Sequence, residues 1–157
     1  MPPVVIGLVS DTHGLVRPAL YDALAGVRMI LHAGDVGGGE VLRALASIAP
    51  VRAVRGNVDP PGPPVAENLE LELEGVSIHV SHGHELGSPT PATLLARYEA
   101  SVIVYGHTHK ALVHHAGARL VVNPGAAGPR RFNLTPSVAK LTIEAGTATA
   151  EVVTLPL

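Results

Sequence analysis

Residues 4–14 read Val-Val-Ile-Gly-Leu-Val-Ser-Asp-Thr-His-Gly, and in them an apolar run leads without a linker into a polar cluster. A continuous apolar run of this length is typical of a strand covered on both faces. The cluster places a carboxylate, Asp11, and an imidazole, His13, two residues apart on the turn that leaves the strand. These two side chains can converge on one cation.

Four later segments repeat this design of an apolar run that ends in a short polar cluster. The clusters are Gly34-Asp35, Gly56-Asn57, His82-Gly83-His84 and Gly106-His107-Thr108-His109. We therefore interpret the chain as a scaffold for one metal site.

Length and composition limit what such a site can be attached to. The 157 residues fit one domain, residues 1–157, with a sizeable core. The apolar content of 46% with only 3% aromatic residues predicts an aliphatic core. The formal charge is −2 and the longest basic run is Arg130-Arg131, which excludes a nucleic-acid patch and a polybasic membrane surface.

The absence of cysteine excludes disulfides, thiolate chemistry and cysteine-based zinc sites. His, Asp, Glu and Asn remain as the strong metal ligands. No apolar stretch approaches the roughly 18 residues needed to span a bilayer, and the first residues carry no basic region. We expect a cytoplasmic protein.

The first half of the chain alternates between strand and helix patterns. Apolar runs predict strands at residues 4–9, 27–31 and 51–54, and helical spacing predicts helices at 17–25 and 40–49. Such alternation predicts parallel strands with helices outside, and ligand sites at the carboxyl ends of the strands. The polar clusters fall at those ends.

The second half reads as a second sheet. Residues 60–64 hold four prolines, which predicts a surface connection between the halves. The segments 69–73 and 76–80 flank a Gly75 turn and predict a hairpin with one solvent-facing side. A helix is expected at 90–100, and short strands at 102–105, 112–115, 119–122, 138–143 and 147–155.

Four histidines outside the polar clusters are expected to have roles other than metal binding. His32 and His79 lie within predicted strands, which favours a structural role. His114 and His115 lie in a predicted hairpin with alternating exposure, which favours solvent contact or ordinary packing.

The five clusters together, in this order, resemble those of the calcineurin-like metallophosphoesterases, specifically the small bacterial and archaeal phosphodiesterases that lack a cap domain. The resemblance covers residues 4–131 and includes Asn123-Pro124-Gly125, where that group usually continues with Ser and this chain has Ala126. It implies an α/β fold, a two-sheet β-sandwich flanked by helices in four layers, α/β/β/α.

Carried over by position, the resemblance implies two divalent metal ions. It assigns Asp11, His13 and His109 to the first ion, assigns Asn57, His82 and His107 to the second, and makes Asp35 the bridge. Oxygen and imidazole ligands suit manganese, our first expectation, and also iron, nickel, cobalt and zinc, while they disfavour calcium.

The implied activity is hydrolysis of phosphodiester bonds by a metal-bridging hydroxide, because two ions about 3.5 to 4 Å apart can activate a shared water. Asp35 and Asn57 thereby belong to the catalytic machinery. Two divalent ions, two carboxylates and a hydroxide leave a small net positive charge, which suits a singly charged diester better than a monoester.

The main departure from the larger relatives is Val58, where they carry a histidine that acts on the leaving group. His84 is the local candidate for that catalytic role, with a structural role as the alternative. Asp59 is expected to orient the Asn57 loop. Arg130 and Arg131 either hold phosphate or form an exposed basic pair.

Two alternatives to the phosphodiesterase stay open. The retromer scaffold subunit is similar to these enzymes, so the chain could be a non-catalytic metal-binding scaffold for protein partners. A phosphomonoester or dinucleotide polyphosphate hydrolase would keep the same site with a different pocket. The expected partner is a small phosphodiester substrate, and a homo-oligomer is compatible with the sequence.

Overall fold

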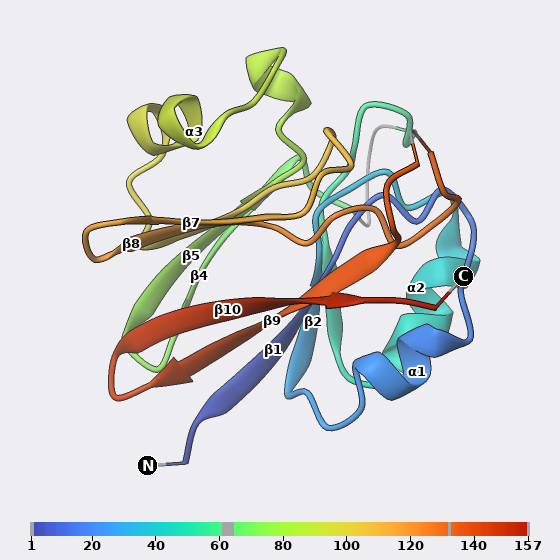
Figure 1. Ribbon diagram of the computed structural model, residues 1–157, viewed down its shortest axis with the longest axis horizontal. Coiled ribbons are helices and arrows are strands. Elements are labelled where there is room, and N and C mark those ends of the chain that lie inside the picture. Colours follow the sequence, from blue (N-terminus) through green and yellow to red (C-terminus); the bar gives the residue numbers. More distant parts are fainter. Residues whose placement is uncertain (1, 61–64, 132, 157) are drawn as a thin grey trace.

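Ten strands form two mixed sheets that pack face to face in the computed structural model, which describes residues 2–60, 65–131 and 133–156 (Figure 1). The order of strands in the first sheet is β10-β9-β1-β2-β3, and in the second β4-β5-β6-β8-β7. This arrangement confirms the predicted two-sheet sandwich.

The first sheet contains the predicted parallel unit. Its strands β1 (Val4–Val9), β2 (Met29–His32) and β3 (Val51–Ala53) run parallel, with Leu8 opposite Leu31. The last two strands, β9 (Ser137–Glu144) and β10 (Thr147–Thr154), return to this sheet and pair antiparallel on the other side of β1. The sheet is therefore mixed, because only strands joined by helical crossovers are parallel.

The two crossover helices are shorter than predicted. Helix α1 spans Ala19–Ala23 and α2 spans Gly39–Ala46, against predicted ranges of 17–25 and 40–49. The hydroxyl of Ser47 donates to the carbonyl of Ala44 at 2.6 Å, a local bond that competes with continued helix.

The second sheet begins at the hairpin, as predicted. Parallel pairing joins β5 to β6 and β6 to β8, and antiparallel pairing adds β4 and β7 at the edges. Thr90 caps helix α3, with Pro91 at its first position. The elements are β4 (Asn68–Leu73), β5 (Val76–Ser81), the 3-10 turn η1 (His84–Leu86), α3 (Pro91–Arg97), β6 (Val102–Val104), β7 (Leu112–Ala116) and β8 (Arg119–Asn123).

Alternating side chains of each strand divide the core into layers. Ile6 and Leu8 of β1 face Ile78 and Val80 of β5 across the space between the sheets. Other side chains of β1 and β2 pack under α1 and α2, and those of β6 and β8 pack under α3. Figure 1 shows α3 on one side of the sandwich and α1 and α2 on the other. The predicted α/β/β/α order is thus confirmed.

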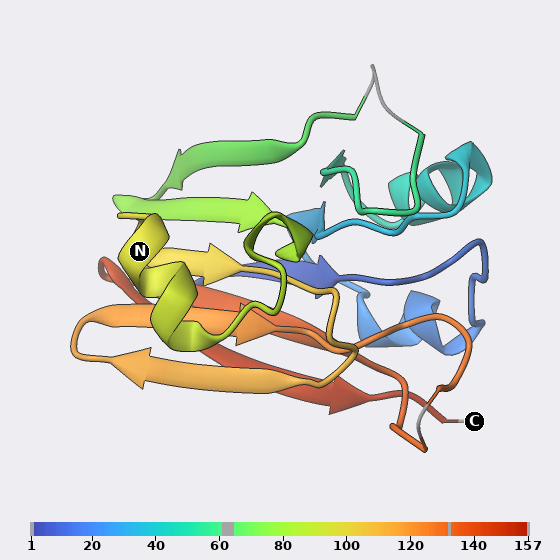
Figure 2. The ribbon, with the colours of Figure 1, turned by 90° about the horizontal axis from the view of Figure 1, so that it is seen from above.

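The parallel strands of both sheets end at the same edge of the molecule. The arrows of β1 (dark blue), β5 and β6 (yellow-green to yellow) point to one end in Figure 2. The loops that follow these strands, and those after β2 and β3, carry the five polar clusters.

Two sequence predictions concern connections and membranes. Apart from Pro60, the predicted proline-rich connection at 60–64 lies outside the described residues. None of the helices in the described part of the chain is long and apolar enough to cross a membrane.

Candidate metal centre

Backbone hydrogen bonds bring the polar loops together. The loop after β1 continues its parallel pairing with the loop after β2, since the amides of Asp11 and His13 donate to the carbonyls of Gly34 and Asp35 at 2.9 and 3.0 Å. In the second sheet, the amide of Gly106 donates to the carbonyl of His82 at 3.0 Å. The candidate ligands therefore stand on loops that the strands hold in register.

Most candidate ligands adopt a left-handed backbone. Positive φ angles at non-glycine residues are uncommon and cluster at functional sites. Here they occur at 53° in Asp11, 45° in His13, 54° in Asp35, 71° in His107 and 66° in His109. The surrounding fold thus imposes a strained conformation on the residues that the sequence singles out.

The first group of side chains is Asp11, His13 and His109. The Asp11 Oδ1 atom lies 3.3 Å from Nε2 of His109 and 3.7 Å from Nε2 of His13. Potential ligand atoms of all three residues lie within 4.8 Å of one another. The residues that the resemblance assigns to the first ion are therefore brought together.

The second group is Asp11, Asp35 and His82. The Nε2 atom of His82 lies 3.2 Å from Asp35 Oδ2 and 3.7 Å from Asp11 Oδ1. Asp35 Oδ2 also lies 3.7 Å from His13 Nε2, so Asp35 faces both groups, as a bridge requires. Asp11 belongs to both groups as well, although the sequence assigned it to one ion.

Asn57 and His107 lie at the rim of the second group. The Oδ1 atom of Asn57 is 3.2 Å from Nδ1 of His107, and the His107 ring packs edge-on against the His82 ring with 5.2 Å between centroids. Burial and the neighbouring His82 lower the pKa of His107. A neutral His107 offers a lone pair to a cation.

Three buried polar atoms in the two groups make no well-aligned hydrogen bond within the described residues. They are Asp11 Oδ1, His13 Nε2 and His82 Nε2. Buried polar atoms are nearly always paired, and these three converge within a few ångströms of one another. The donor set therefore fits a bound cation.

The charges of the carboxylates agree with this fit. Burial favours the neutral form of Asp11, yet interactions with the imidazoles of His109 and His13 hold the pKa of Asp11 well below its usual range. Burial likewise opposes ionisation of Asp35, but its interaction with His82 lowers the pKa of Asp35. Burial also opposes protonation of His82, yet the same interaction with Asp35 raises the pKa of His82. Both carboxylates are anionic at neutral pH, as metal binding requires.

Neighbouring groups fix how the ligands point. His82 Nδ1 donates to the Ala33 carbonyl at 2.8 Å, because a carbonyl can only accept, and this leaves Nε2 directed at the carboxylates. Ser10 Oγ and the His107 amide both donate to Asp11 Oδ2, at 2.6 and 3.1 Å. Only Asp11 Oδ1 is left to face the site.

Sequence reasoning missed the support that Asn123 gives, although it noted the Asn123-Pro124-Gly125 loop. The Asn123 Nδ2 group donates to the Gly106 carbonyl at 3.2 Å and to Thr108 Oγ1 at 3.0 Å. Its Oδ1 atom accepts from the Gly125 amide at 2.9 Å. This amide side chain therefore fixes the loop that carries His107 and His109.

Two glycines of the clusters are required by close packing. An added side chain at Gly56 would collide with the Asp35 carboxylate, and one at Gly106 would collide with Ser10 and Asp11. The glycines therefore let the loops approach the candidate ligands.

The structural interpretation of His32 is confirmed. His32 is fully buried, its Nδ1 atom accepts from the Gly34 amide at 3.1 Å, and its Nε2 atom lies 3.0 Å from Thr12 Oγ1. Thr12 in turn donates to the Val36 carbonyl at 2.8 Å. His32 thus ties the first two polar loops together without reaching the cation position.

The other histidines outside the clusters also match expectation. His79 is buried, stacks on Tyr98 with 3.7 Å between ring centroids, and contacts Glu70. His114 and His115 are both exposed on β7, which agrees with the expected solvent contact but not with the expected alternation of exposure along the hairpin.

Asp59 orients the loop of Asn57, as predicted. Its carboxylate accepts from the amides of Gly56 at 2.9 Å, Val36 at 3.0 Å and Gly37 at 3.1 Å. These three bonds join the loop after β3 to the loop after β2.

His84, Val58 and the arginine pair surround the centre. The His84 ring lies 5.4 Å from that of His82 and its Nδ1 atom is buried, while Val58 is 60% exposed beside Asn57. Arg130 and Arg131 line a small depression together with His109. Their location keeps a phosphate-binding role open.

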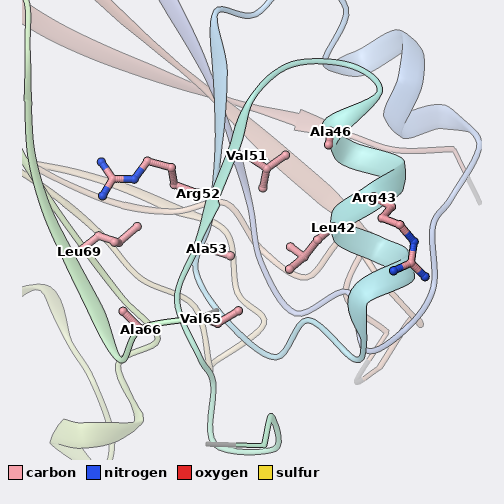
Figure 3. A pocket seen from close by; sticks show the side chains of 9 residues that line it. All are labelled: Leu42, Arg43, Ala46, Val51, Arg52, Ala53, Val65, Ala66 and Leu69. Atoms are coloured by element: carbon pink, nitrogen blue, oxygen red, sulfur yellow. The ribbon is translucent and has the colours of Figure 1, made fainter. Parts of the chain in front are cut away.

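A larger hollow of about 440 Å³ lies away from the polar clusters, at the edge where β3 and α2 approach β4 (Figure 3). Among the described residues, its wall is mostly aliphatic and contains no histidine or carboxylate. The lining residues are Leu42, Arg43, Ala46, Val51, Arg52, Ala53, Val65, Ala66 and Leu69. This hollow lacks the chemistry of the candidate centre.

Comparison with known proteins finds matches in sequence and in fold. Residues 4–146 match the family model described as the calcineurin-like phosphoesterase superfamily domain. A probable metallophosphoesterase of Methanothermobacter thermautotrophicus is 32% identical over 161 residues, covering 96% of this chain and 92% of that protein. A phosphodiesterase of Methanocaldococcus jannaschii is 27% identical over 139 residues, covering 76% of this chain and 82% of that protein.

Among solved structures, Vps29 of Chaetomium thermophilum superposes with a TM-score of 0.80 and 20% identity, covering 97% of both chains. At this identity the likeness concerns the fold alone.

Proposed function

Since the chain belongs to the calcineurin-like phosphoesterase superfamily, we propose that it is a phosphodiesterase that works with two divalent metal ions. The observation that carries the proposal is that two carboxylate oxygens and three imidazole nitrogens converge within a few ångströms, namely Asp11 Oδ1, Asp35 Oδ2 and the Nε2 atoms of His13, His82 and His109. Among the described residues, Asp11 Oδ1 and the Nε2 atoms of His13 and His82 are buried without a well-aligned hydrogen bond. The similarity to a phosphodiesterase supports the diester as substrate.

The residues of the centre divide between two ions. Asp11, His13 and His109 would hold the first, and His82 with Asn57 and His107 would hold the second, while Asp35 faces both. When bound, two such ions supply a nucleophilic water at neutral pH and neutralise the charge that develops on the phosphoryl group.

The chain's own residues keep the ligands in the required form. The Ala33 carbonyl keeps one proton of His82 on Nδ1. The Nε2 atom, which faces the Asp35 carboxylate, would lose its proton when a cation binds and would then offer its lone pair to that cation. Ser10 and the His107 amide occupy Asp11 Oδ2 and direct Oδ1 into the site. This preorganisation avoids rearrangement when substrate binds.

His84 is proposed as the group that gives a proton to the leaving oxygen. Its ring lies beside the second group of ligands, with centroid distances of 5.4 Å to the His82 ring and 6.4 Å to the His107 ring. Val58, which occupies the position of the larger relatives' histidine, cannot transfer a proton. General acid catalysis of this kind contributes about 10²- to 10⁴-fold.

Arg130 and Arg131 are proposed to hold anionic oxygens of the substrate. They line a depression together with His109, whereas His84 lies beside His82. Guanidinium groups bind phosphate oxygens through paired charge-assisted hydrogen bonds.

Manganese is the proposed native metal, because the ligands are oxygen and imidazole without thiolate. We also propose that residues 1–157 act as one domain and that the protein works in the cytoplasm. These parts of the proposal rest on the sequence.

The experiment that tests the function measures metal content by mass spectrometry and hydrolysis of bis(p-nitrophenyl) phosphate with and without manganese. Close to two metals per chain with manganese-stimulated turnover is the expected result. Metal without turnover, across several divalent ions and diesters, would favour the scaffold alternative. Faster turnover of p-nitrophenyl phosphate than of the diester would favour the monoesterase.

A further inference from the structure

A polar hollow lies next to the candidate metal centre on the side of His84. Its volume is about 190 Å³, and it opens between the start of β4, the turn η1 and the end of α3. The lining residues are Glu67, Asn68, Ser81, His84, Glu85, Arg97 and Tyr98.

His84 is the wall that the hollow shares with the centre. Its ring lies 5.4 Å from the His82 ring and 6.4 Å from the His107 ring, and its side chain also lines the hollow. If a phosphoryl group is bound at the candidate metal centre, a substituent on it that is directed past His84 enters the hollow.

The far wall of the hollow is rigid. Glu85 accepts from the Gly83 amide at 3.0 Å and from the Tyr98 hydroxyl at 2.8 Å. The Tyr98 ring stacks on His79, and the guanidinium of Arg97 lies over the ring at 5.3 Å from its centroid. A preformed wall reduces the entropy that a ligand loses on binding.

The polar atoms of the wall suit hydroxyl groups. Asn68 contributes an amide, Ser81 a hydroxyl, and His84 a buried Nδ1 atom that has no hydrogen-bond partner among the described residues. The carboxylates of Glu67 and Glu85 accept hydrogen bonds, and because they outnumber the single guanidinium of Arg97, the wall disfavours a second anionic group. An uncharged ligand with several hydroxyls matches this set.

Size and stacking exclude larger ligands. A volume of 190 Å³ is the share of roughly six waters and lies below the range of about 300 Å³ and above that drug-sized ligands occupy. A nucleobase would need an open aromatic face, but the Tyr98 ring already stacks on His79 and has the Arg97 guanidinium over it, so a base would compete with these two contacts.

We propose that this hollow binds a polyol the size of glycerol, as the alcohol part of the phosphodiester substrate. The inference rests on the proposed phosphodiesterase function and specifies its substrate class. Hydrolysis there breaks the bond between phosphorus and the glycerol oxygen, water supplies the new oxygen on phosphorus, and the glycerol oxygen takes up a proton.

The test compares three symmetric diesters with the manganese-loaded protein: bis(p-nitrophenyl), bis(glyceryl) and dipropyl phosphate. Glyceryl and propyl groups share a three-carbon skeleton but differ in their hydroxyls and in the acidity of the leaving alcohol, so the change that a variant makes in their ratio of kcat/KM isolates the contacts to the hydroxyls. We expect a preference for the glyceryl diester of about tenfold or more, because a site built for hydroxyls leaves polar groups unpaired with the propyl analogue.

The variant Asn68→Leu should reduce this preference about fivefold or more, since it replaces the amide by an apolar side chain of similar size. Ser81→Ala provides a second, independent loss of a polar group. Glu72→Leu is the matched control, because Glu72 is exposed on the same face of β4 as Asn68 but outside the hollow, and it should keep the wild-type ratio.

The outcomes separate the two proposals. Turnover of the aryl diester with no preference for the glyceryl diester, or with a preference that neither variant changes, would overturn the polyol subsite and leave the phosphodiesterase standing. No turnover of any diester by the loaded wild-type protein would overturn both.

Discussion

At the scale of single residues, Asp35 is the side chain that faces both groups of candidate ligands. Its Oδ1 atom accepts from the Val58 amide at 3.0 Å, which fixes the carboxylate, and its Oδ2 atom faces His82 and His13 at 3.2 and 3.7 Å. One oxygen is thus held by the backbone while the other is directed at both groups of ligands.

The variant Asp35→Asn should therefore lose most bound metal and lower kcat/KM at least about 1000-fold, since several kcal/mol of charge stabilisation depend on both ions. Metal content by mass spectrometry and diester turnover measure the two losses. Asp22→Asn, at an exposed position of α1, is the control and should behave as wild type. Full activity of Asp35→Asn would refute the assigned centre.

His32 gives the protein a pH-dependent stability. Burial lowers the pKa of His32 from 6.5 to about 4 in the folded protein. The unfolded chain takes up a proton at this residue below pH 6.5, whereas the folded chain does so only near pH 4. Stability should therefore fall as the pH drops from 6.5 to 4, by up to about 1.4 kcal/mol per pH unit.

Urea unfolding of metal-free protein at several pH values in this window checks the prediction. In His32→Asn, whose side-chain oxygen can still accept from the Gly34 amide, the slope of unfolding free energy against pH should decrease by about one proton. His82, whose pKa is raised, adds a pH dependence above pH 6.5, and Asp11 and Asp35, whose pKa values are lowered, add one near pH 4. The comparison of the two proteins, rather than the wild-type slope, therefore isolates His32. Equal slopes would contradict the assignment.

At the scale of elements, the loops after the strands depend on side chains that never face the cation. Asp59 binds three backbone amides from the loops after β2 and β3, and Asn123 holds the loop after β6. Such groups set the ligand geometry through the backbone, and outer-shell partners of this kind affect metal affinity about 10- to 100-fold.

Asp59→Asn should destabilise the protein by about 1 to 3 kcal/mol, because the amide nitrogen that replaces one carboxylate oxygen cannot accept, and the remaining bonds lose the negative charge of the acceptor. Its apparent manganese affinity should fall while turnover at saturating manganese recovers. Unfolding curves and metal titrations of turnover measure the two effects. Loss of turnover that saturating manganese cannot restore would instead make Asp59 part of the reaction.

At the scale of the whole molecule, the proposed ions join loops from both sheets. Asp11 and Asp35 follow strands of the first sheet, and His82, His107 and His109 follow strands of the second. Binding to the folded state alone therefore stabilises the contact between the sheets by mass action.

Manganese at about 100 times its Kd should add about 2.7 kcal/mol, which corresponds to a rise in Tm of about 5 to 11 °C for a domain of this length. Thermal unfolding with manganese and with a chelator measures the shift. Asp35→Asn should lose most of it, and an unchanged Tm in the wild-type protein would contradict metal binding by the folded state.

The sequence alone determined the elements and the choice of candidate ligands. Apolar runs of strand length and amphipathic helical spacing are local patterns that can be recognised in the sequence itself. They predicted the strands β1 to β3, the hairpin of β4 and β5, and the start of α3 at Thr90. The candidate ligands stood out because each follows an apolar run, and parallel strands bring their carboxyl ends to one edge.

How segments far apart in the sequence meet depends on tertiary packing. This packing returns β9 and β10 to the first sheet, brings Asp11 close to both groups of ligands, and forms the polar hollow beside His84. These features depend on contacts such as that of the His107 amide with Asp11, which are 96 residues apart. Local periodicity predicts which side of a helix or strand is buried. It does not predict which other element covers that side, because this depends on the packing of the whole chain.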